Sequence, residues 1–433
     1  METTQKIQDK KTNTKLFPIY KMFSWDLLFY YSIIYLFLTQ AKNFSASEVL
    51  LAESFFTASC LFLQILIGLL VDKFGKKNSL VFANICMCVF ITILLFTNNY
   101  KMLLLANFID AIGYVIKGVC ETNILYDSLP SGEKRGTLYS SIDGVGAASY
   151  YVIDAITSII AGITFAIDPY IPVVLCLIVN IIALILSTRF KHTQSQREEE
   201  HSKETARQYF KELREAIKFT FNSKRMLCLM LFFGLMSGLT YNLSTYRSNI
   251  LNSINIPAQY FGVIFAIIQI MAGICSKGQG WLHKRFKNNT LSVLGIPYVA
   301  SCFIIGCLVD SFGESVSNIV VILFILQGAI KGAYNVLIYR YLNNFTNRKI
   351  RVKLATIRNM FFNMISILIS LLGSFLLKVT TSGNTFLIVG GICTVCMVLL
   401  LDYMRGKVGL KPEKYNKEDL KYSSFNEGGN LKW

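Results

Sequence analysis

The chain has 433 residues, of which 53% are hydrophobic and only 16% are charged, and its mean hydropathy is +0.47. Soluble domains carry about 25% charged residues, so this composition excludes an ordinary water-soluble protein. The net charge of +17 would suit a nucleic-acid-binding protein, but the basic residues lie between long apolar segments, and we expect no nucleic-acid partner.

Apolar segments of about 20 residues recur along the chain, and each is long enough to cross a hydrocarbon layer roughly 30 Å thick. Only a helix satisfies its own backbone hydrogen bonds at that depth in lipid, so these segments are predicted to be helices. We predict an all-α membrane protein with twelve transmembrane helices at residues 22–40, 48–71, 79–97, 102–126, 138–163, 170–188, 226–246, 258–280, 291–309, 317–340, 354–377 and 384–404.

Basic residues are unevenly distributed between these segments. If the loops are counted alternately as inside and outside, starting inside, the outside loops hold little beyond Lys42, Lys101 and Arg247. The inside loops hold nearly all the others, including those at 73–77, 134–135, 189–225, 284–287 and 348–353. The positive-inside rule therefore predicts a multi-pass protein of the cytoplasmic membrane with both termini in the cytoplasm. No small-residue cleavage site follows the first apolar segment, so we expect no cleaved signal peptide.

The composition changes sharply in the middle of the chain, where residues 189–224 are strongly charged. From about Ser202 apolar residues recur at helical spacing, which predicts an amphipathic helix at the membrane surface. We therefore expect a cytoplasmic N-terminal segment (1–15), a six-helix bundle (16–188), a cytoplasmic linker (189–224), a second six-helix bundle (225–405) and a disordered cytoplasmic tail (406–433).

The two predicted bundles resemble each other in sequence. Asn43 corresponds to Asn255 at an offset of 212, and Ile116-Lys117-Gly118 recurs as 330–332 at an offset of 214. Identity is low, but the matches keep their order and nearly the same offset. Parallel repeats of this kind are typical of transporters, whose substrate site lies between the repeats near the membrane midplane.

A short motif, GLLVDKFGKK, joins the second and third predicted spans at residues 68–77. Together with twelve spans and a central charged segment, it resembles the loop signature of the major facilitator superfamily, and the resemblance covers about residues 16–405. It implies alternating access between two pseudo-symmetric halves, with a gate at the cytoplasmic rim. The gate residues so implied are Gly68, Asp72, Lys73, Gly75, Lys76, Lys77, Asp127 and Arg135.

The end of the fourth predicted span narrows the resemblance. An acidic residue at Glu121, a Tyr126-Asp127-Ser128-Leu129 turn and the basic Arg135 resemble the bacterial drug-export and related branches of the superfamily. The arginine that proton-coupled exporters carry in the fourth span is absent, and Ile109 stands near that place.

Charged residues inside the predicted spans are the best candidates for a site, because a charge at the bilayer centre costs at least ~2.5–3.5 kcal/mol. Asp110, Lys117 and Glu121 lie within roughly 40° of one another on the fourth span, at about 100° per residue. Lys117 and Glu121 are also placed to pair as i and i+4 neighbours. The predicted substrate and proton-coupling cavity comprises Asp26, Tyr30, Asp110, Lys117, Glu121, Tyr150, Asp154, Gln327, Lys331 and Asn335.

Two interpretations of these charges stay open. Lys117 and Glu121 can bind substrate, or they can form an internal ion pair that only fixes helix packing. Asp110 and Asp154 have no obvious partner nearby in sequence, and we hypothesise that at least one of them carries a proton during transport. The paired lysines indicate an anionic or polar substrate group, and the aromatic residues indicate an apolar body.

The sequence therefore predicts a secondary active transporter that exports a small organic, amphiphilic or anionic solute by proton-coupled antiport. Alternatives are an importer of a nutrient or organic anion, and a membrane-embedded lipid-handling protein or enzyme. We expect a monomer with no enzymatic activity, no cofactor and no metal, because the sequence has no nucleophile arrangement or phosphate-binding loop and its 11 cysteines are scattered. The expected partners are a small-molecule substrate, a proton or other ion gradient, and the lipid bilayer.

Overall fold

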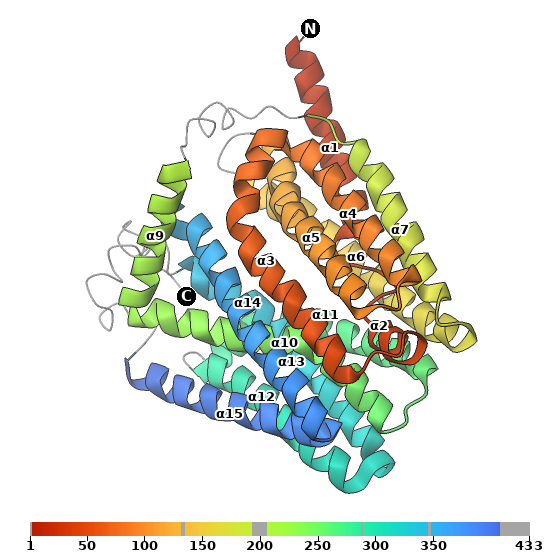
Figure 1. Cartoon of the computed structure of the whole chain (residues 1–433). Coiled ribbons are helices and arrows are strands. Elements are labelled where there is room, and N and C mark those ends of the chain that lie inside the picture. The colour runs from red at the N-terminus through yellow and green to blue at the C-terminus, as the bar shows by residue number, and fades with distance from the viewer. Residues whose placement is uncertain (1, 131–134, 193–205, 287–288, 345–347, 408–433) are drawn as a thin grey trace. The chain divides into compact units, whose positions relative to one another are not determined.

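The computed structural model describes residues 2–130, 135–192, 206–286, 289–344 and 348–407, and all regular secondary structure in these residues is helical (Figure 1). The chain forms two compact units, one of Met1–Thr205 with Pro257–Ala266 and the other of Ala206–Ile256 with Ile267–Trp433.

The first unit comprises α1 (Glu2–Ser24), α2 (Ile34–Leu36), η1 (Phe37–Ala41), α3 (Ala46–Phe74), α4 (Lys76–Phe96), α5 (Tyr100–Ser128), α6 (Arg135–Ile167) and α7 (Ile171–Thr188). In this unit α5 packs mainly against α3, α4 and α1, and α7 packs against α4, α1 and α6. At one end of this unit Phe17, Tyr20, Leu125 and Phe190 are buried in a common apolar core, and the ring of Tyr20 meets Phe190 edge-on at 5.2 Å.

The second unit begins with the amphipathic helix of the central segment. Its elements are α9 (Ala206–Asn222), α10 (Lys224–Ser253), α11 (Ala258–Phe286, whose first turns cluster with the first unit), α12 (Thr290–Phe312), η3 (Gly313–Val316), α13 (Ser317–Asn344), α14 (Arg348–Val379) and α15 (Ser382–Lys407). Close packing in this unit uses small residues: a Cβ at Gly238 of α10 would lie 3.0 Å from the backbone nitrogen of Ser366 in α14.

Ten segments of the described residues are long and apolar enough to cross a membrane, and one of them, Thr290–Asn335, runs through α12, η3 and α13. Each predicted span after the first overlaps a single helix. The all-α membrane fold predicted from the sequence is thus confirmed.

The first predicted span is not one helix, and the prediction of a continuous helix over 22–40 is wrong. Helix α1 ends at Ser24, residues between it and α2 form turns, and Phe29 has a left-handed φ of 62°. No proline or glycine stands in 22–40, so the break has another cause. Asp26 accepts hydrogen bonds from the Leu27 amide (2.9 Å) and the Tyr31 hydroxyl (2.7 Å), and such local side-chain bonds compete with helix formation.

Two of the basic residues counted above as lying in outside loops are instead buried. Arg247 lies within α10, 9% exposed, with its guanidinium 5.2 Å from the ring of Phe324. Lys42 is 5% exposed and donates to the Leu95 carbonyl at 2.7 Å. The Lys42 ammonium thus has a hydrogen-bond acceptor inside the protein, and the Arg247 guanidinium is held against an aromatic ring although its buried Nε has no hydrogen-bond acceptor among the described residues.

The internal repeat reappears in the backbone at Asn43 and Asn255. Both residues are left-handed, with φ of 59° and 56°, and both follow the end of a helical segment. The amide of the next residue donates a hydrogen bond back to the helix in each case. Phe44 donates to the Leu38 carbonyl and Ile256 to the Leu251 carbonyl, each at 3.0 Å. Asparagine tolerates the left-handed region, so the same residue ends corresponding segments in both repeats.

A single residue, Gly75, connects α3 to α4. Its φ of 81° and ψ of 144° lie in a region that is essentially open only to glycine, although no atom would obstruct a Cβ there. The turn of the GLLVDKFGKK motif therefore needs this glycine for its backbone conformation and not for space.

We expect Gly75→Ala to lower the free energy of unfolding by about 1–3 kcal/mol, because alanine is strained in this conformation. The matched control is Gly278→Ala in α11, where a Cβ likewise meets nothing within 4 Å and φ is not positive. That change should be neutral or stabilising, since alanine favours a helix over glycine by about 1 kcal/mol. Thermal unfolding of the purified protein checks both, and equal effects would contradict the backbone argument.

Candidate functional site

The broken end of α1 is where the charged side chains of α5 converge. Lys117 Nζ donates to the Trp25 carbonyl at 3.4 Å, and Glu121 Oε1 accepts from the Ser24 hydroxyl at 3.4 Å. Both charged residues are buried, at 8% and 9% exposure, and among the described side chains they form no ion pair with each other. The structure thus joins these two residues through the end of α1, which sequence spacing alone could not show.

Helix α6 approaches the same end of α1 from another side. Lys21 forms a 2.5 Å ion pair with Asp143, and its Nζ lies 4.6 Å from the ring of Trp25. The aliphatic part of Lys21 runs over Gly146, where a Cβ would lie 3.0 Å from the Lys21 Cβ. Lys21 is not among the site residues selected from the sequence; the signal that could have found it is the acidic and glycine-containing stretch 143–146 on the fifth predicted span.

Aromatic rings complete this cluster. Trp25 packs edge-on against Tyr150 at 5.2 Å and Tyr151 at 5.1 Å. Tyr150 is buried, whereas Trp25 is half-buried and Tyr151 is 43% exposed. Asp154, one turn beyond Tyr150 on α6, is 6% exposed. Trp25 and Tyr151 are additions to the residues selected from the sequence.

Asp26 and Tyr30 lie within the break itself. Tyr30 is half-buried, and its ring meets Tyr31 edge-on at 5.2 Å, next to the Asp26–Tyr31 hydrogen bond. Asp110, on α5 seven residues before Lys117, is half-buried and lies within electrostatic reach of both Asp26 and Lys117. Three carboxylates therefore belong to the surroundings of the break: Asp26, Asp110 and Glu121.

The predicted residues of the tenth span lie in the second unit, on α13. Gln327 is 1% exposed, and its Nε2 donates to Ser301 Oγ at 2.8 Å and contacts Cys302 Sγ at 3.4 Å, both on α12. Its Oε1 is buried and has no hydrogen-bond partner among the described residues. Lys331 and Asn335 follow at one-turn intervals and are half-buried.

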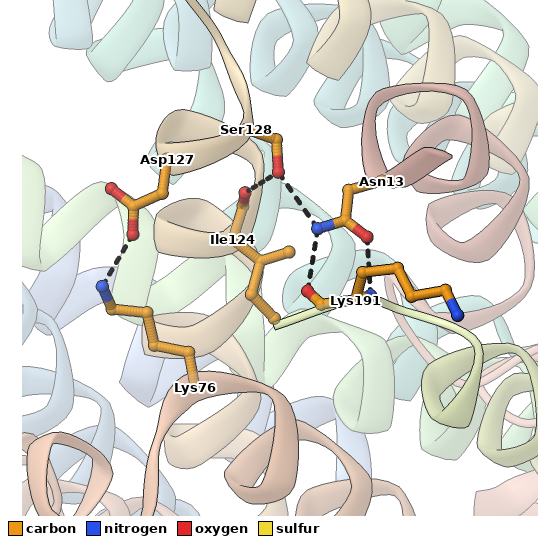
Figure 2. Close-up of polar contacts among 6 residues, drawn as sticks. All are labelled: Asn13, Lys76, Ile124, Asp127, Ser128 and Lys191. Atoms are coloured by element: carbon orange, nitrogen blue, oxygen red, sulfur yellow. Dashed lines mark hydrogen bonds and ion pairs between the residues drawn. The ribbon is translucent and has the colours of Figure 1, made fainter. Parts of the chain in front are cut away.

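The predicted gate has one well-defined ion pair. Lys76, the first residue of α4, bonds to Asp127 near the end of α5 at 2.6 Å, and the two side chains are 16% and 5% exposed (Figure 2). Both residues belong to the first unit, so this pair fixes the end of α5 to the glycine turn before α4. Lys77 is half-buried.

Polar contacts beside this pair connect two more segments of the first unit to α5 (Figure 2). Asn13 of α1 donates from Nδ2 to the Ser128 hydroxyl (3.2 Å) and to the Lys191 carbonyl (3.0 Å), and its Oδ1 accepts from the Lys191 amide (2.8 Å). Ser128 in turn donates to the Ile124 carbonyl at 2.7 Å. The ends of α5 and α7 are thereby anchored to the middle of α1.

The other predicted gate positions fall outside the side chains that the structure describes: Gly68, Asp72, Lys73 and Arg135. Among the described residues, no group of three or more His, Cys, Asp or Glu side chains lies close enough to hold a metal ion.

The model of the family described as the Major Facilitator Superfamily matches residues 16–320 and 292–426, which is most of the chain. The chain belongs to this superfamily. It is therefore a multi-pass membrane protein and a secondary transporter of a small solute, not an enzyme.

Solved transporters share this fold at low sequence identity. The chain is similar to a variant of the nucleoside transporter NupG (TM-score 0.71, 15% identity, covering 91% of this chain and 99% of that chain). It is also similar to a D-xylose-proton symporter (TM-score 0.66, 13% identity, 91% and 96%) and to a POT family transporter in complex with 5-aminolevulinic acid (TM-score 0.62, 12% identity, 92% and 96%). A comparison with curated protein sequences gives no match.

The Lys76–Asp127 pair can be tested by a double-mutant cycle. We expect Asp127→Asn to lower the free energy of unfolding by about 1–3 kcal/mol, because it replaces a charge-assisted bond to the Lys76 ammonium by a neutral one. Lys76→Gln in addition to Asp127→Asn should cost less than the sum of the single changes. The neighbouring Lys77→Gln serves as the control and should add independently to Asp127→Asn. Strict additivity for Lys76 and Asp127 in thermal unfolding would contradict the pairing.

Proposed function

We propose that this protein couples the movement of a small organic solute to protons, and that the end of α1 is a working part of its transport site. The observation that carries the proposal is the convergence of charged groups from α5 and α6 on the broken first span. We further propose export by proton antiport across the cytoplasmic membrane, with both termini in the cytoplasm, as the basic-residue distribution favours. Import of a nutrient or organic anion is the second candidate.

Proton coupling is supported by the role of Asp26 in the break. An ionised carboxylate only accepts hydrogen bonds, and Asp26 accepts from the Leu27 amide and the Tyr31 hydroxyl. A proton on Asp26 would occupy one lone pair and turn the group into a donor, which weakens the bonds that compete with helix formation. Gain and loss of a proton would thus be felt directly by the backbone of the first span.

Asp110 links this switch to α5. It lies within electrostatic reach of Asp26 and Lys117, so neutralising either carboxylate changes the field on the other and on the lysine. Lys117 holds the Trp25 carbonyl at 3.4 Å, a long hydrogen bond that an anionic substrate group could replace. We propose that substrate and proton compete for the same contacts at the end of α1.

The aromatic residues favour a substrate with an apolar body. Trp25 and Tyr151 present partly exposed ring surface beside the charged groups, an arrangement that suits an amphiphilic molecule. The similar solved structures include a nucleoside transporter, a D-xylose-proton symporter and a transporter complexed with 5-aminolevulinic acid, and all these names denote small polar solutes. They favour a polar substrate, and the symporter favours the import alternative.

We propose that the gate residues hold the cytoplasmic rim closed when the site faces outward. They are Gly75, Lys76, Lys77 and Asp127, together with four residues whose side chains lie outside the described part of the structure: Gly68, Asp72, Lys73 and Arg135. Exposed ion pairs contribute about 0–1 kcal/mol each, so a few of them can form and part as the cavity opens. The Lys76–Asp127 pair would then keep the rim of the first unit rigid while other contacts change.

The substrate class can be found by measuring thermal stabilisation of the purified protein by drugs, nucleosides, sugars, peptides and organic anions. For a stabilising anionic compound, Lys117→Gln and Lys331→Ala are each expected to weaken binding about tenfold or more, because a charge-assisted hydrogen bond contributes about 1.5–3 kcal/mol. The control is Lys101→Gln, an exposed lysine at the start of α5. Unchanged affinity in both variants would show that these lysines only stabilise the fold.

Proton coupling is tested in proteoliposomes with the compound so identified. We expect at least one of Asp26→Asn, Asp110→Asn and Asp154→Asn to lose about tenfold or more of the flux driven by a pH gradient, as an amide cannot carry the proton. Exchange of labelled for unlabelled substrate without a gradient should persist in that variant. The control is Asp402→Asn, an exposed residue of α15. Full gradient-driven flux in all three variants would overturn the proposal. In the wild type, the direction of the pH gradient that drives uptake distinguishes antiport from symport.

A further inference from the structure

One side of helix α9 is buried against the rest of the protein. Leu213, Ala216, Phe219 and Thr220 are 6%, 0%, 3% and 0% exposed, and the helix packs against α10 and α14 of the same unit (Figure 1). This apolar side explains why a segment so rich in charge forms a helix at all.

The opposite side of α9 is basic and exposed. Lys211, Arg214 and Lys218 are all exposed and stand three and four residues apart, which places them within roughly 60° on the helix surface. Phe221, 59% exposed, continues the row. Glu215, the exposed acidic residue among the described side chains of this stretch, lies at the edge of the row, so positive charge dominates the described part of the row.

The position of α9 brings this row to a membrane surface. Only Ser223 separates α9 from α10, a membrane-spanning helix, and the Ser223 hydroxyl accepts the Met226 amide at 3.1 Å as the N-cap of α10. Figure 1 shows α9 running across the direction of α10 and not continuing it. With α10 across the bilayer, a helix in this orientation would lie along the bilayer surface, where exposed charges within about a Debye length (~8–10 Å) act on the lipid headgroups.

We propose that the row of Lys211, Arg214, Lys218 and Phe221 binds the headgroups of anionic phospholipids. The three cations extend over eight residues, roughly 10 Å along the axis for the seven steps of 1.5 Å between the first and the last, which suits several headgroups side by side better than one small phosphate ion. Arginine and lysine donate to lipid phosphates, and the exposed phenyl ring enters the boundary with the acyl chains. Lipid binding here would fix α9 on the surface, and with it the start of α10.

The test uses the full-length protein in nanodiscs of phosphatidylcholine alone and in nanodiscs with equal amounts of phosphatidylglycerol. Hydrogen–deuterium exchange of the α9 amides is read by mass spectrometry. In the wild type, anionic lipid should slow this exchange about tenfold or more, given the contribution of each basic residue near a charged surface, and added salt should reverse the effect. In the triple variant Lys211→Gln, Arg214→Gln, Lys218→Gln the lipid dependence should disappear.

A matched triple variant removes the same charge elsewhere, at Lys101, Lys277 and Lys378, which are exposed on other helices. It should keep the lipid dependence of α9. Equal exchange of α9 in both lipids for the wild type, or equal lipid dependence in the α9 triple variant, would overturn the proposal and leave a merely solvated helix face. Inorganic phosphate added to phosphatidylcholine nanodiscs should not reproduce the protection; if it does, the site binds free phosphate and the proposal fails.

Discussion

Lipid offers no hydrogen-bond partner, so every charge and every free backbone group inside a span must find its partner in the protein. The end of α1 shows how this constraint organises the first unit. A helix that stops at Ser24 leaves carbonyl groups without amides, and a lysine on α5 is costly without an acceptor. The Lys117–Trp25 hydrogen bond meets both needs at once, and the Ser24 hydroxyl donates to the Glu121 carboxylate beside it. The break and the charges therefore stabilise each other at the end of α1.

The contacts around this end differ in strength. Lys21 and Asp143 are 2.5 Å apart and charged on both sides, whereas the bonds from α5 are 3.4 Å long, near the limit for a hydrogen bond. Helices α1 and α6 also pack closely at Gly146, where the absence of a side chain leaves room for Lys21. If α1 moves during transport, it should stay with α6 and part from α5, because the weaker bonds yield first. Lys117 and Glu121 would then be released together.

Local sequence properties were sufficient for most of the fold. Length and apolar content define each span after the first. The 212-residue offset matches Asn43 with Asn255, and both residues have a left-handed conformation. The break at Trp25 was not predictable in this way, because 22–40 contains neither proline nor glycine. The residues that contact the end of α1 lie far along the chain: Lys117 is 92 residues from Trp25, and Asp143 is 122 residues from Lys21. For the same reason, helical spacing predicted only that Lys117 and Glu121 pair with each other, whereas in the structure both side chains bond to the end of α1.

The structure also changes how the net charge of +17 should be understood. The positive-inside count treats every basic residue alike, but Lys76 is neutralised by Asp127, and Lys42 and Arg247 are buried against carbonyl and aromatic groups. Such residues add little to the field at a membrane surface. Lys211, Arg214 and Lys218 are exposed and lie on the helix next to the start of a span, so their charge is not neutralised by burial. A count of basic residues by loop therefore overstates the contribution of Lys42, Lys76 and Arg247 to surface charge, whereas α9 carries a concentrated group of exposed cations.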